Sequence, residues 1–267
     1  MSDAVESRDV ALTVNSLTKK GQENIYGYNG LEEISFSFEK KGIHGILAPK
    51  GSGKTQLMNI ISGCETYDDG AVLLFNTPVS VSDYEVKKRI GYVQKNNVFY
   101  PNMTAMEIMS FVGDSRRVEQ GKLYRQVKEA MELTGIDGIK NRLVKNMTEY
   151  EQKKLSLAAA LLGNPDIILL DELVTPKMND GQLSALFGLI QMLGKMKTVI
   201  LSTDSYKIAK ELCEDVVIIS DGKVLAKGRF DILEDKLKGS EDTASLEALY
   251  NSLAAASEIK HSKAKGE

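Results

Sequence analysis

The feature that most constrains this chain is a glycine-containing loop between a short apolar run and a helix-compatible run. Residues 43–56 read I-H-G-I-L-A-P-K-G-S-G-K-T-Q, and L-M-N-I-I follows. Glycines let successive backbone N–H groups turn toward an anion, and the helix N-terminus behind them adds partial positive charge. This order of strand, loop and helix therefore predicts a cradle for the phosphates of a nucleoside triphosphate.

Each residue of this loop has an expected role. In phosphoryl-transfer sites a lysine reaches the β- and γ-phosphates and a neighbouring hydroxyl holds Mg²⁺, which assigns these roles to Lys54 and Thr55. The other candidate phosphate contacts are their neighbours: Ala48, Pro49, Lys50, Gly51, Ser52, Gly53 and Gln56. Ala48 replaces the first glycine of G-x-x-x-x-G-K-[ST] and excludes only backbone angles that glycine would allow. The alternative is a coincidental Gly/Ser loop, and the intact G-S-G-K-T run argues against it.

Composition and charge exclude several other classes of protein. With 42% hydrophobic and 27% charged residues the composition is that of a globular protein. The net charge of −3 gives no general attraction to nucleic acid. Two histidines leave no basis for a histidine metal site, and the distant Cys64 and Cys213 fit thiols in a reducing compartment. No run approaches the ~18 apolar residues that span a bilayer, and the start does not resemble a signal peptide. We therefore expect a cytosolic protein.

Apolar patterns elsewhere in the chain predict an α/β fold. Alternating apolar residues predict strands at Val10–Val14 and Ile34–Phe38, before the strand of the phosphate loop. Ile167–Leu170 is a continuous apolar run, typical of a buried parallel strand. Capping-box patterns at Thr104 and Thr148 predict helix starts, and an Asp-Gly hairpin closes the series. The prediction is a P-loop NTPase core with a mostly parallel sheet, an N-terminal antiparallel β subdomain and an inserted α-helical subdomain.

Two acidic residues follow the apolar run 167–170. Asp171, at the carboxyl end of this strand, can hold Mg²⁺ directly or through a water, and Glu172 can act as general base on the attacking water. The alternative is that these two residues are only a polar end of the strand, without a catalytic role. The phosphate loop in the same chain favours the functional interpretation. Far more chain separates Lys54 from Asp171 than the ~30 residues of one strand–helix–strand unit. We therefore expect a helical subdomain at about 101–164 within an ATP-binding domain of 1–230, followed by a helical extension and disordered tail over 231–267.

These motifs resemble the ATP-binding subunit of ABC transporters over residues 9–253. The phosphate loop is similar to G-P-N-G-x-G-K-[ST]-T, residues 90–104 resemble the Q-loop segment, and 154–172 are similar to the stretch from signature helix to Walker B. The resemblance implies ATP and Mg²⁺ as ligands and Glu172 as the catalytic base. It also implies an aromatic ring under the adenine, which we assign to Tyr26, with an ordinary exposed turn tyrosine as the alternative. The family's Q-loop glutamine best matches Lys95, and Gln94, one residue earlier, is taken as a candidate metal ligand.

Several positions depart from the family's pattern. Residues 147–151 read M-T-E-Y-E where the family has L-S-G-G-Q, Asp204 stands at the switch histidine, and Met178 stands at the D-loop aspartate. In the family the signature residues contact the γ-phosphate held by the opposite subunit, so Glu149 would bring a carboxylate near a phosphate. Asp204 is a hydrogen-bond acceptor where the family has a potential donor. These departures resemble those of family members that bind ATP and hydrolyse it slowly.

The resemblance implies two alternative functions. The first is an ATP-hydrolysing transporter subunit, peripheral on the cytoplasmic face of the membrane through a separate membrane-spanning subunit. It would close on a second nucleotide-binding domain as a homodimer or heterodimer. The second is a catalytically impaired ATP-binding module that pairs with a competent ATPase. In the family the loop 96–104 meets the membrane subunit, and Phe99 and Tyr100 suit that role or pack on the helical subdomain. The acidic charge argues against a nucleic-acid partner.

Overall fold

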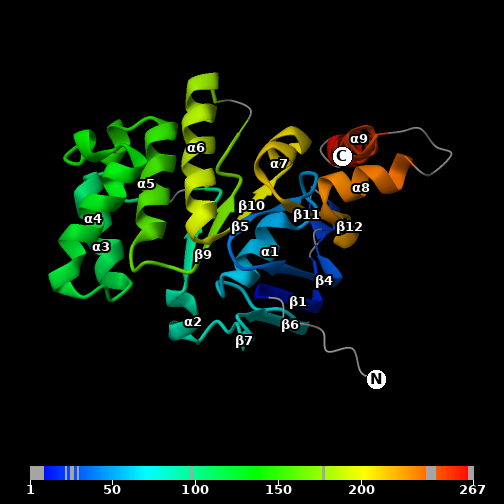
Figure 1. Cartoon of the computed structure of the whole chain (residues 1–267), viewed down its shortest axis with the longest axis horizontal. Coiled ribbons are helices and arrows are strands. Elements are labelled where there is room, and N and C mark those ends of the chain that lie inside the picture. The colour runs from blue at the N-terminus through cyan, green and yellow to red at the C-terminus, as the bar shows by residue number, and fades with distance from the viewer. Residues whose placement is uncertain are drawn as a thin grey trace.

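The structure of the protein is a computed structural model that describes residues 9–21, 23–24, 27–28, 30–96, 99–175, 178–238 and 245–263. In this part of the chain a mostly parallel sheet and an antiparallel sheet pack together, and a group of helices lies to one side (Figure 1). The predicted α/β class, with an N-terminal antiparallel part and an inserted helical part, is confirmed.

The larger sheet has six strands in the order β12-β11-β5-β10-β9-β8. These strands are β12 (Lys223–Arg229), β11 (Asp215–Ser220), β5 (Gly42–Leu47), β10 (Thr198–Thr203), β9 (Ile167–Asp171) and β8 (Ile90–Val93). All neighbours are parallel except β11 and β12, which pair antiparallel. The turn between those two consists of Asp221 and Gly222, with φ of 46° and 75°. Two positive φ values in a two-residue loop suit the right-handed twist of a hairpin, as the Asp-Gly pair predicts.

The central strands are apolar on both faces because each face packs on a different layer. In β9, Ile167 and Leu169 belong to the core beneath the antiparallel sheet, whereas Ile168 and Leu170 belong to the core on the other side. Successive side chains of a strand point to opposite faces, so a strand covered on both sides needs a continuous apolar run. This explains why the run 167–170 could be recognised as a buried strand.

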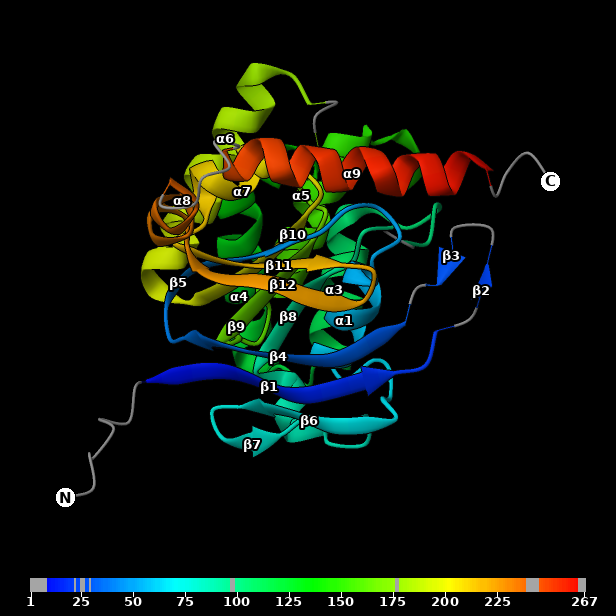
Figure 2. The same cartoon turned by 90° about the vertical axis from the view of Figure 1, so that its right-hand side faces the viewer.

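The antiparallel sheet covers one face of the parallel sheet, with a single helix between them. Its order is β4-β1-β6-β7, with bounds β4 (Leu31–Glu39), β1 (Val10–Lys19), β6 (Asp69–Leu74) and β7 (Thr77–Pro78). Helix α1 (Lys54–Ile61) buries Leu57, Met58, Ile60 and Ile61 in the core shared by both sheets. A short hairpin of β2 (Glu23–Asn24) and β3 (Gly27–Tyr28) extends from the edge (Figure 2). The helix of the phosphate loop is therefore held on two sides.

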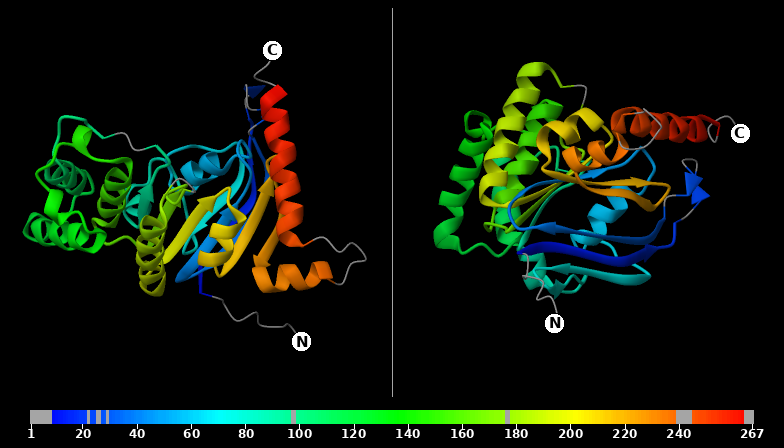
Figure 3. Two further views of the ribbon diagram at one scale, coloured as in Figure 1. Left: turned by 90° about the horizontal axis from the view of Figure 1, so that it is seen from above. Right: turned by 45° about the vertical axis from the view of Figure 1, so that its right-hand side comes forward.

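The helical part forms its own apolar cluster beside the sheets (Figure 3, green in the left view). It contains α3 (Ala105–Ser115), α4 (Gln120–Thr134), α5 (Glu149–Leu161) and short 3₁₀ turns at Asp137–Ile139 and Val144–Asn146, and the small helix α2 (Tyr84–Lys88) precedes β8. Thr104 with Glu107 and Thr148 with Glu151 make the predicted capping boxes at α3 and α5. Gly135 ends α4 in the left-handed conformation, φ 63°. Local sequence signals therefore fix these boundaries.

Four helices cover the remaining face of the parallel sheet: α6 (Asp180–Met196), α7 (Tyr206–Leu212), α8 (Phe230–Lys238) and α9 (Leu246–Lys263). Helix α6 begins at Asp180, where Asn179 and Gln182 make a third capping box. Phe230, Leu246 and Tyr250 join the core formed by α6 and α7, so α8 and α9 pack on the same layer. Among the described helices, none is both long and apolar enough to cross a bilayer.

Candidate functional site

The predicted phosphate loop connects β5 to α1, and its two later glycines hold its shape. Gly51 and Gly53 have φ of 80° and 85°, which other residues adopt only with strain. Gly53 is the N-cap residue of α1, and the backbone N–H of Ala48 donates to Thr203 O at 3.1 Å, which fixes the loop to the end of β10. The loop thus meets a helix N-terminus at the carboxyl edge of the parallel sheet, an arrangement suited to anions.

Lys54 is the buried cation of this loop. Its side chain is 3% exposed, and Nζ donates to the backbone oxygens of Ala48 at 2.6 Å and Pro49 at 2.9 Å. Nζ also lies 3.6 Å from Oε1 of Glu172. Burial lowers the pKa of the Lys54 ammonium, while the charges of Glu172 and Asp204 oppose that shift. The structure therefore concentrates positive charge where the loop turns into the helix.

Asp171 ends β9 and is fully buried. Its Oδ1 accepts a hydrogen bond from Ser202 Oγ on the neighbouring strand, and its Oδ2 has no hydrogen-bond partner. Burial raises the pKa of the carboxyl, and hydrogen bonding from Ser202 and Thr55 opposes this shift. A buried oxygen without a partner beside a threonine hydroxyl is the oxygen-donor set that Mg²⁺ prefers. Thr55 and Asp171 thus fit the predicted metal.

Ser202 is a site residue that the sequence reasoning missed. It lies opposite Asp171 in the register of β10 and β9, and it also accepts a hydrogen bond from the backbone N–H of Glu172 at 3.1 Å. A signal was available, because T-V-I-L-S-T and I-I-L-L-D are both apolar strands that end in polar residues. When such strands are parallel neighbours, their carboxyl ends meet.

Glu172, the candidate base, is the first residue beyond β9 and has a left-handed backbone, φ 48°. Its carboxylate is bracketed by two ammonium groups, Lys54 Nζ at 3.6 Å and Lys95 Nζ at 2.9 Å. Lys153 of α5 donates to the backbone oxygens of Glu172 at 3.3 Å and Leu173 at 3.1 Å. The position of Glu172 is therefore fixed by the helical part as well as by the sheet.

Gln94 and Lys95 point to different surroundings. Gln94, the predicted metal ligand, lines a cleft with Tyr92, Phe99 and Arg116 between β8 and the helical part, whereas Lys95 reaches Glu172. Side chains that follow one another along an extended segment face opposite ways, so only one of these two can face the end of β9. The residue that faces the end of β9 is Lys95, which carries an ammonium group, and not Gln94 with its amide oxygen.

The other predicted residues lie at various distances from this centre. The Gln56 side chain donates to Glu65 at 3.3 Å, Ser52 is buried, and the Lys50 side chain, 62% exposed, lies 3.9 Å from a carboxylate oxygen of Asp204. Asp204 follows β10 at the predicted switch position. Tyr26, the predicted adenine contact, lies outside the described residues.

The N-terminus of α5 carries the altered signature sequence. Glu149 and Glu151 occupy its first turn, and the Thr148 hydroxyl is engaged by Glu151, which also binds Arg142 at 2.8 Å. Carboxylates in the first turn offset the positive end of the helix dipole. This helix N-terminus is therefore a poor site for a further anion.

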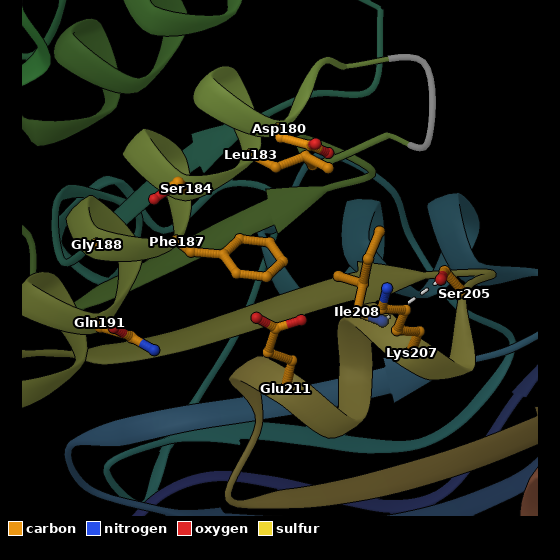
Figure 4. Close-up of a pocket in the computed structure, with 10 residues that line it drawn as sticks. All are labelled: Asp180, Leu183, Ser184, Phe187, Gly188, Gln191, Ser205, Lys207, Ile208 and Glu211. Carbon is orange, nitrogen blue, oxygen red and sulfur yellow. Dashed lines mark hydrogen bonds between the residues drawn. The ribbon is translucent and has the colours of Figure 1, made fainter.

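A cavity of about 640 Å³ lies apart from these residues, between α6 and α7. Figure 4 shows Phe187 pointing from α6 toward α7, with Glu211 on the α7 side. Its lining residues come from α6, α7 and Ser205. This cavity is therefore separate from the phosphate loop.

Comparison with known proteins agrees with the geometry of the site. The family model described as ABC transporter matches residues 31–175. The chain is 28% identical over 221 residues to ABC transporter A family member 11 of Dictyostelium discoideum. The aligned region covers 82% of this chain and 26% of that protein. The chain spans 26% to 62% of the length of the curated relatives it matches.

Solved structures show the same fold. The ATP-binding subunit of an ABC transporter superposes with a TM-score of 0.77 at 20% identity, covering 91% of this chain and 99% of that one. A dimeric, post-hydrolysis state of an ATP-binding cassette bound to ADP and Pi gives a TM-score of 0.72 at 21% identity, covering 82% and 98%. The likeness covers both sheets and the helical part, and at this identity it concerns the fold alone.

Proposed function

Because the chain belongs to the ABC transporter family, we propose that it acts as the ATP-binding subunit of a transporter and holds ATP and Mg²⁺ at the phosphate loop. The observation that carries this proposal is the convergence of a buried lysine with an unpartnered buried carboxylate oxygen. Lys54, at the N-terminus of α1, lies 3.6 Å from Glu172, and the unpartnered oxygen belongs to the preceding residue, Asp171. Both groups are costly to bury without a ligand of opposite charge.

The residues of the chain divide the work of binding. Backbone N–H groups of the loop and the start of α1 attract the phosphates, and Lys54 adds a full positive charge. Thr55 and Asp171 would hold Mg²⁺, which when bound neutralises charge on the phosphate oxygens. Glu172 is the residue that would orient and deprotonate the attacking water.

Equilibrium binding tests the site. We expect Lys54→Ala to lower ATP affinity about 100-fold, because it removes a buried charge-assisted contact, whereas Lys207→Ala on the exposed side of α7 should bind like the wild type. Thermal unfolding of each variant without nucleotide checks that the fold is intact. Unchanged ATP affinity in a folded Lys54→Ala variant would contradict the site assignment.

We further propose that turnover by this chain alone is slow and that it pairs with a second, competent nucleotide-binding domain. Two features support this: the acidic first turn of α5, which would repel a partner's γ-phosphate, and the ion pairs that engage the Glu172 carboxylate. In the family the α5 N-terminus completes the opposite subunit's pocket, so Glu149 would weaken that half of the dimer.

Single-turnover hydrolysis of Mg-ATP, with wild type and Glu172→Gln side by side, separates the alternatives. We expect both to bind ATP and both to release phosphate slowly at high protein concentration. Rapid hydrolysis by the purified wild-type chain, lost in Glu172→Gln, would establish an autonomous ATPase and reject the impaired module.

For the membrane-spanning subunit we propose a docking surface beside the cleft that contains Gln94. Tyr100 and Phe111 are 62% and 52% exposed and pack edge to face with ring centroids 6.2 Å apart. An exposed aromatic pair, whose members adjoin the cleft residues Phe99 and Val112 in sequence, suits a protein partner. A photo-crosslinker at Tyr100 should label an integral membrane protein in native membranes, and one at Leu225, which is 51% exposed, should not. Equal labelling from both positions would contradict this surface.

We also propose that residues 1–230 make up the ATP-binding domain, with 101–164 as its helical subdomain and 231–267 as an extension. The separate apolar cluster of the helical part and the start of α8 at Phe230 support this division. Docking through the surface at Tyr100 would hold the chain on the cytoplasmic face of the membrane.

A further inference from the structure

Lys95 brings a second ammonium group to the candidate metal site. Its Nζ lies 2.9 Å from Oε2 of Glu172, while Lys54 Nζ lies 3.6 Å from Oε1 of the same carboxylate. The Lys95 side chain is 43% exposed and that of Glu172 is 16% exposed, so Lys95 reaches inward from the rim. The neighbouring Asp171 Oδ2 is buried and unpartnered.

The Lys95 ammonium group makes this site less favourable for a divalent metal ion. A protonated lysine has three donors and no acceptor, so it cannot be a metal ligand. It also repels Mg²⁺ placed beside the same carboxylates. Gln94, which has an amide oxygen to offer, lines the cleft with Arg116 instead. Thr55 and Asp171 remain as oxygen donors next to the phosphate loop.

The same cation is well placed to neutralise a triphosphate. A bound γ-phosphate near Lys54 would be attracted by both ammonium groups. The flexible side chain of Lys95 would let its ammonium group move from Glu172 toward the phosphate. Lysines bind phosphates as point charges and need no fixed geometry. Two lysines and the loop N–H groups together supply charge that in other sites comes from the metal.

We propose that Lys95 supplies the cation that accompanies the triphosphate, so that this chain binds metal-free ATP nearly as tightly as Mg-ATP. The inference rests on the proposed function, because it concerns the same phosphate loop. It adds a tolerance for the ionic form of the ligand: the nucleoside triphosphate is accepted with or without its divalent ion.

The test measures the affinity for ATP carrying a fluorescent group on the ribose, once with excess Mg²⁺ and once with EDTA. For the wild type we expect the two dissociation constants to agree within about threefold, and for Lys95→Gln the EDTA value to be weaker by about tenfold or more. Lys95→Arg, which keeps the charge, should behave like the wild type. Lys207→Gln, which loses the same charge at an exposed position of α7, should also keep the wild-type ratio.

The outcomes separate this inference from the proposed function. If the wild type binds ATP only with Mg²⁺, the proposed function stands and the role of Lys95 is rejected. If Lys95→Gln keeps the wild-type ratio, the role of Lys95 is likewise rejected. If no ATP binds under either condition, the proposed function fails and this inference fails with it. The ATP-induced rise in melting temperature, measured in both buffers without any label, must follow the same order, and the melting temperatures without ATP verify that each variant folds.

Discussion

The hydroxyl of Tyr250 on α9 donates a hydrogen bond of 2.9 Å to the backbone oxygen of Asp204. The Tyr250 side chain is almost fully buried, and its ring lies 6.3 Å from that of Tyr206. Tyr206 itself stacks edge to face on Phe230 and donates to Glu234 at 2.8 Å. Helix α9 is thus attached directly to the residue at the switch position, and α8 is attached to Tyr206, two residues further on.

Removing this hydroxyl should destabilise the fold modestly and loosen the residue after β10. We expect Tyr250→Phe to lower the free energy of unfolding by about 1 kcal/mol, the usual value of one hydrogen bond. Hydrogen exchange at 204–206 should become faster at the same time. Tyr124→Phe, at a position 72% exposed, serves as the control. Unchanged exchange at 204–206 would show that α9 does not hold this segment.

The ion pair between buried His44 and partly exposed Asp215 should make stability depend on pH. His44 Nε2 contacts Lys41 O at 2.9 Å and Nδ1 contacts Asp215, so both nitrogens donate only in the imidazolium form. Burial by itself would lower the pKa of His44, but the hydrogen bond and charge of Asp215 outweigh it, and the pKa is raised overall. A raised folded-state pKa stabilises the protein fully below the unfolded value of about 6.5, and this contribution is lost as pH rises through the folded-state pKa.

We therefore expect Asp215→Asn to cost more stability at about pH 6 than at about pH 9, by roughly 1 to 2 kcal/mol. Urea unfolding at the two pH values measures the difference. Asp180→Asn, on the exposed start of α6, controls for the loss of a carboxylate. A penalty independent of pH would mean that His44 is neutral in the folded protein.

We expect the buried carboxylate of Asp171 to lower the free energy of unfolding. Its carboxylate is buried with one oxygen unpartnered, so Asp171→Asn removes a buried charge and should raise the free energy of unfolding by about 1 kcal/mol. The same variant should bind Mg²⁺ more weakly in the presence of ATP. Thermal unfolding without nucleotide, followed by metal titration with ATP, measures both. A destabilised variant would show that Lys54 and Lys95 already compensate the charge.

Replacing the acidic turn of α5 should improve the dimer. In Glu149→Gly with Tyr150→Gly, a carboxylate and a ring leave the helix N-terminus, at a stability cost of about 0.5 to 1 kcal/mol per glycine. We expect ATP to induce self-association of this variant at lower protein concentration than for the wild type, as measured by light scattering. Glu129→Gly on exposed α4 controls for glycine in a helix. Equal association in all three proteins would contradict a role for the signature residues.

The elements that could be predicted are those with local signals. The helix ends at Thr104, Thr148 and Gly135 are set by contacts within a few residues. The apolar run 167–170 predicts a strand covered on both faces. The site was harder because its members come from separate elements. That Lys153 of α5 holds the Glu172 backbone depends on how the helical part packs on β9, which no local pattern encodes. The choice between Gln94 and Lys95 depends on the exact end of β8, where prediction by pattern is weakest.

The backbone of Glu172 lies in the left-handed region, which a non-glycine residue enters at a cost of about 1 kcal/mol. If folding alone had decided this position, glycine or asparagine would be the better occupant. The chain instead has a glutamate at this position, directly after the buried strand β9. Its carboxylate forms ion pairs with Lys54 and Lys95. If Glu172 is the base that we propose, its backbone strain is retained for catalysis, and a library selected only for thermal stability should replace it early.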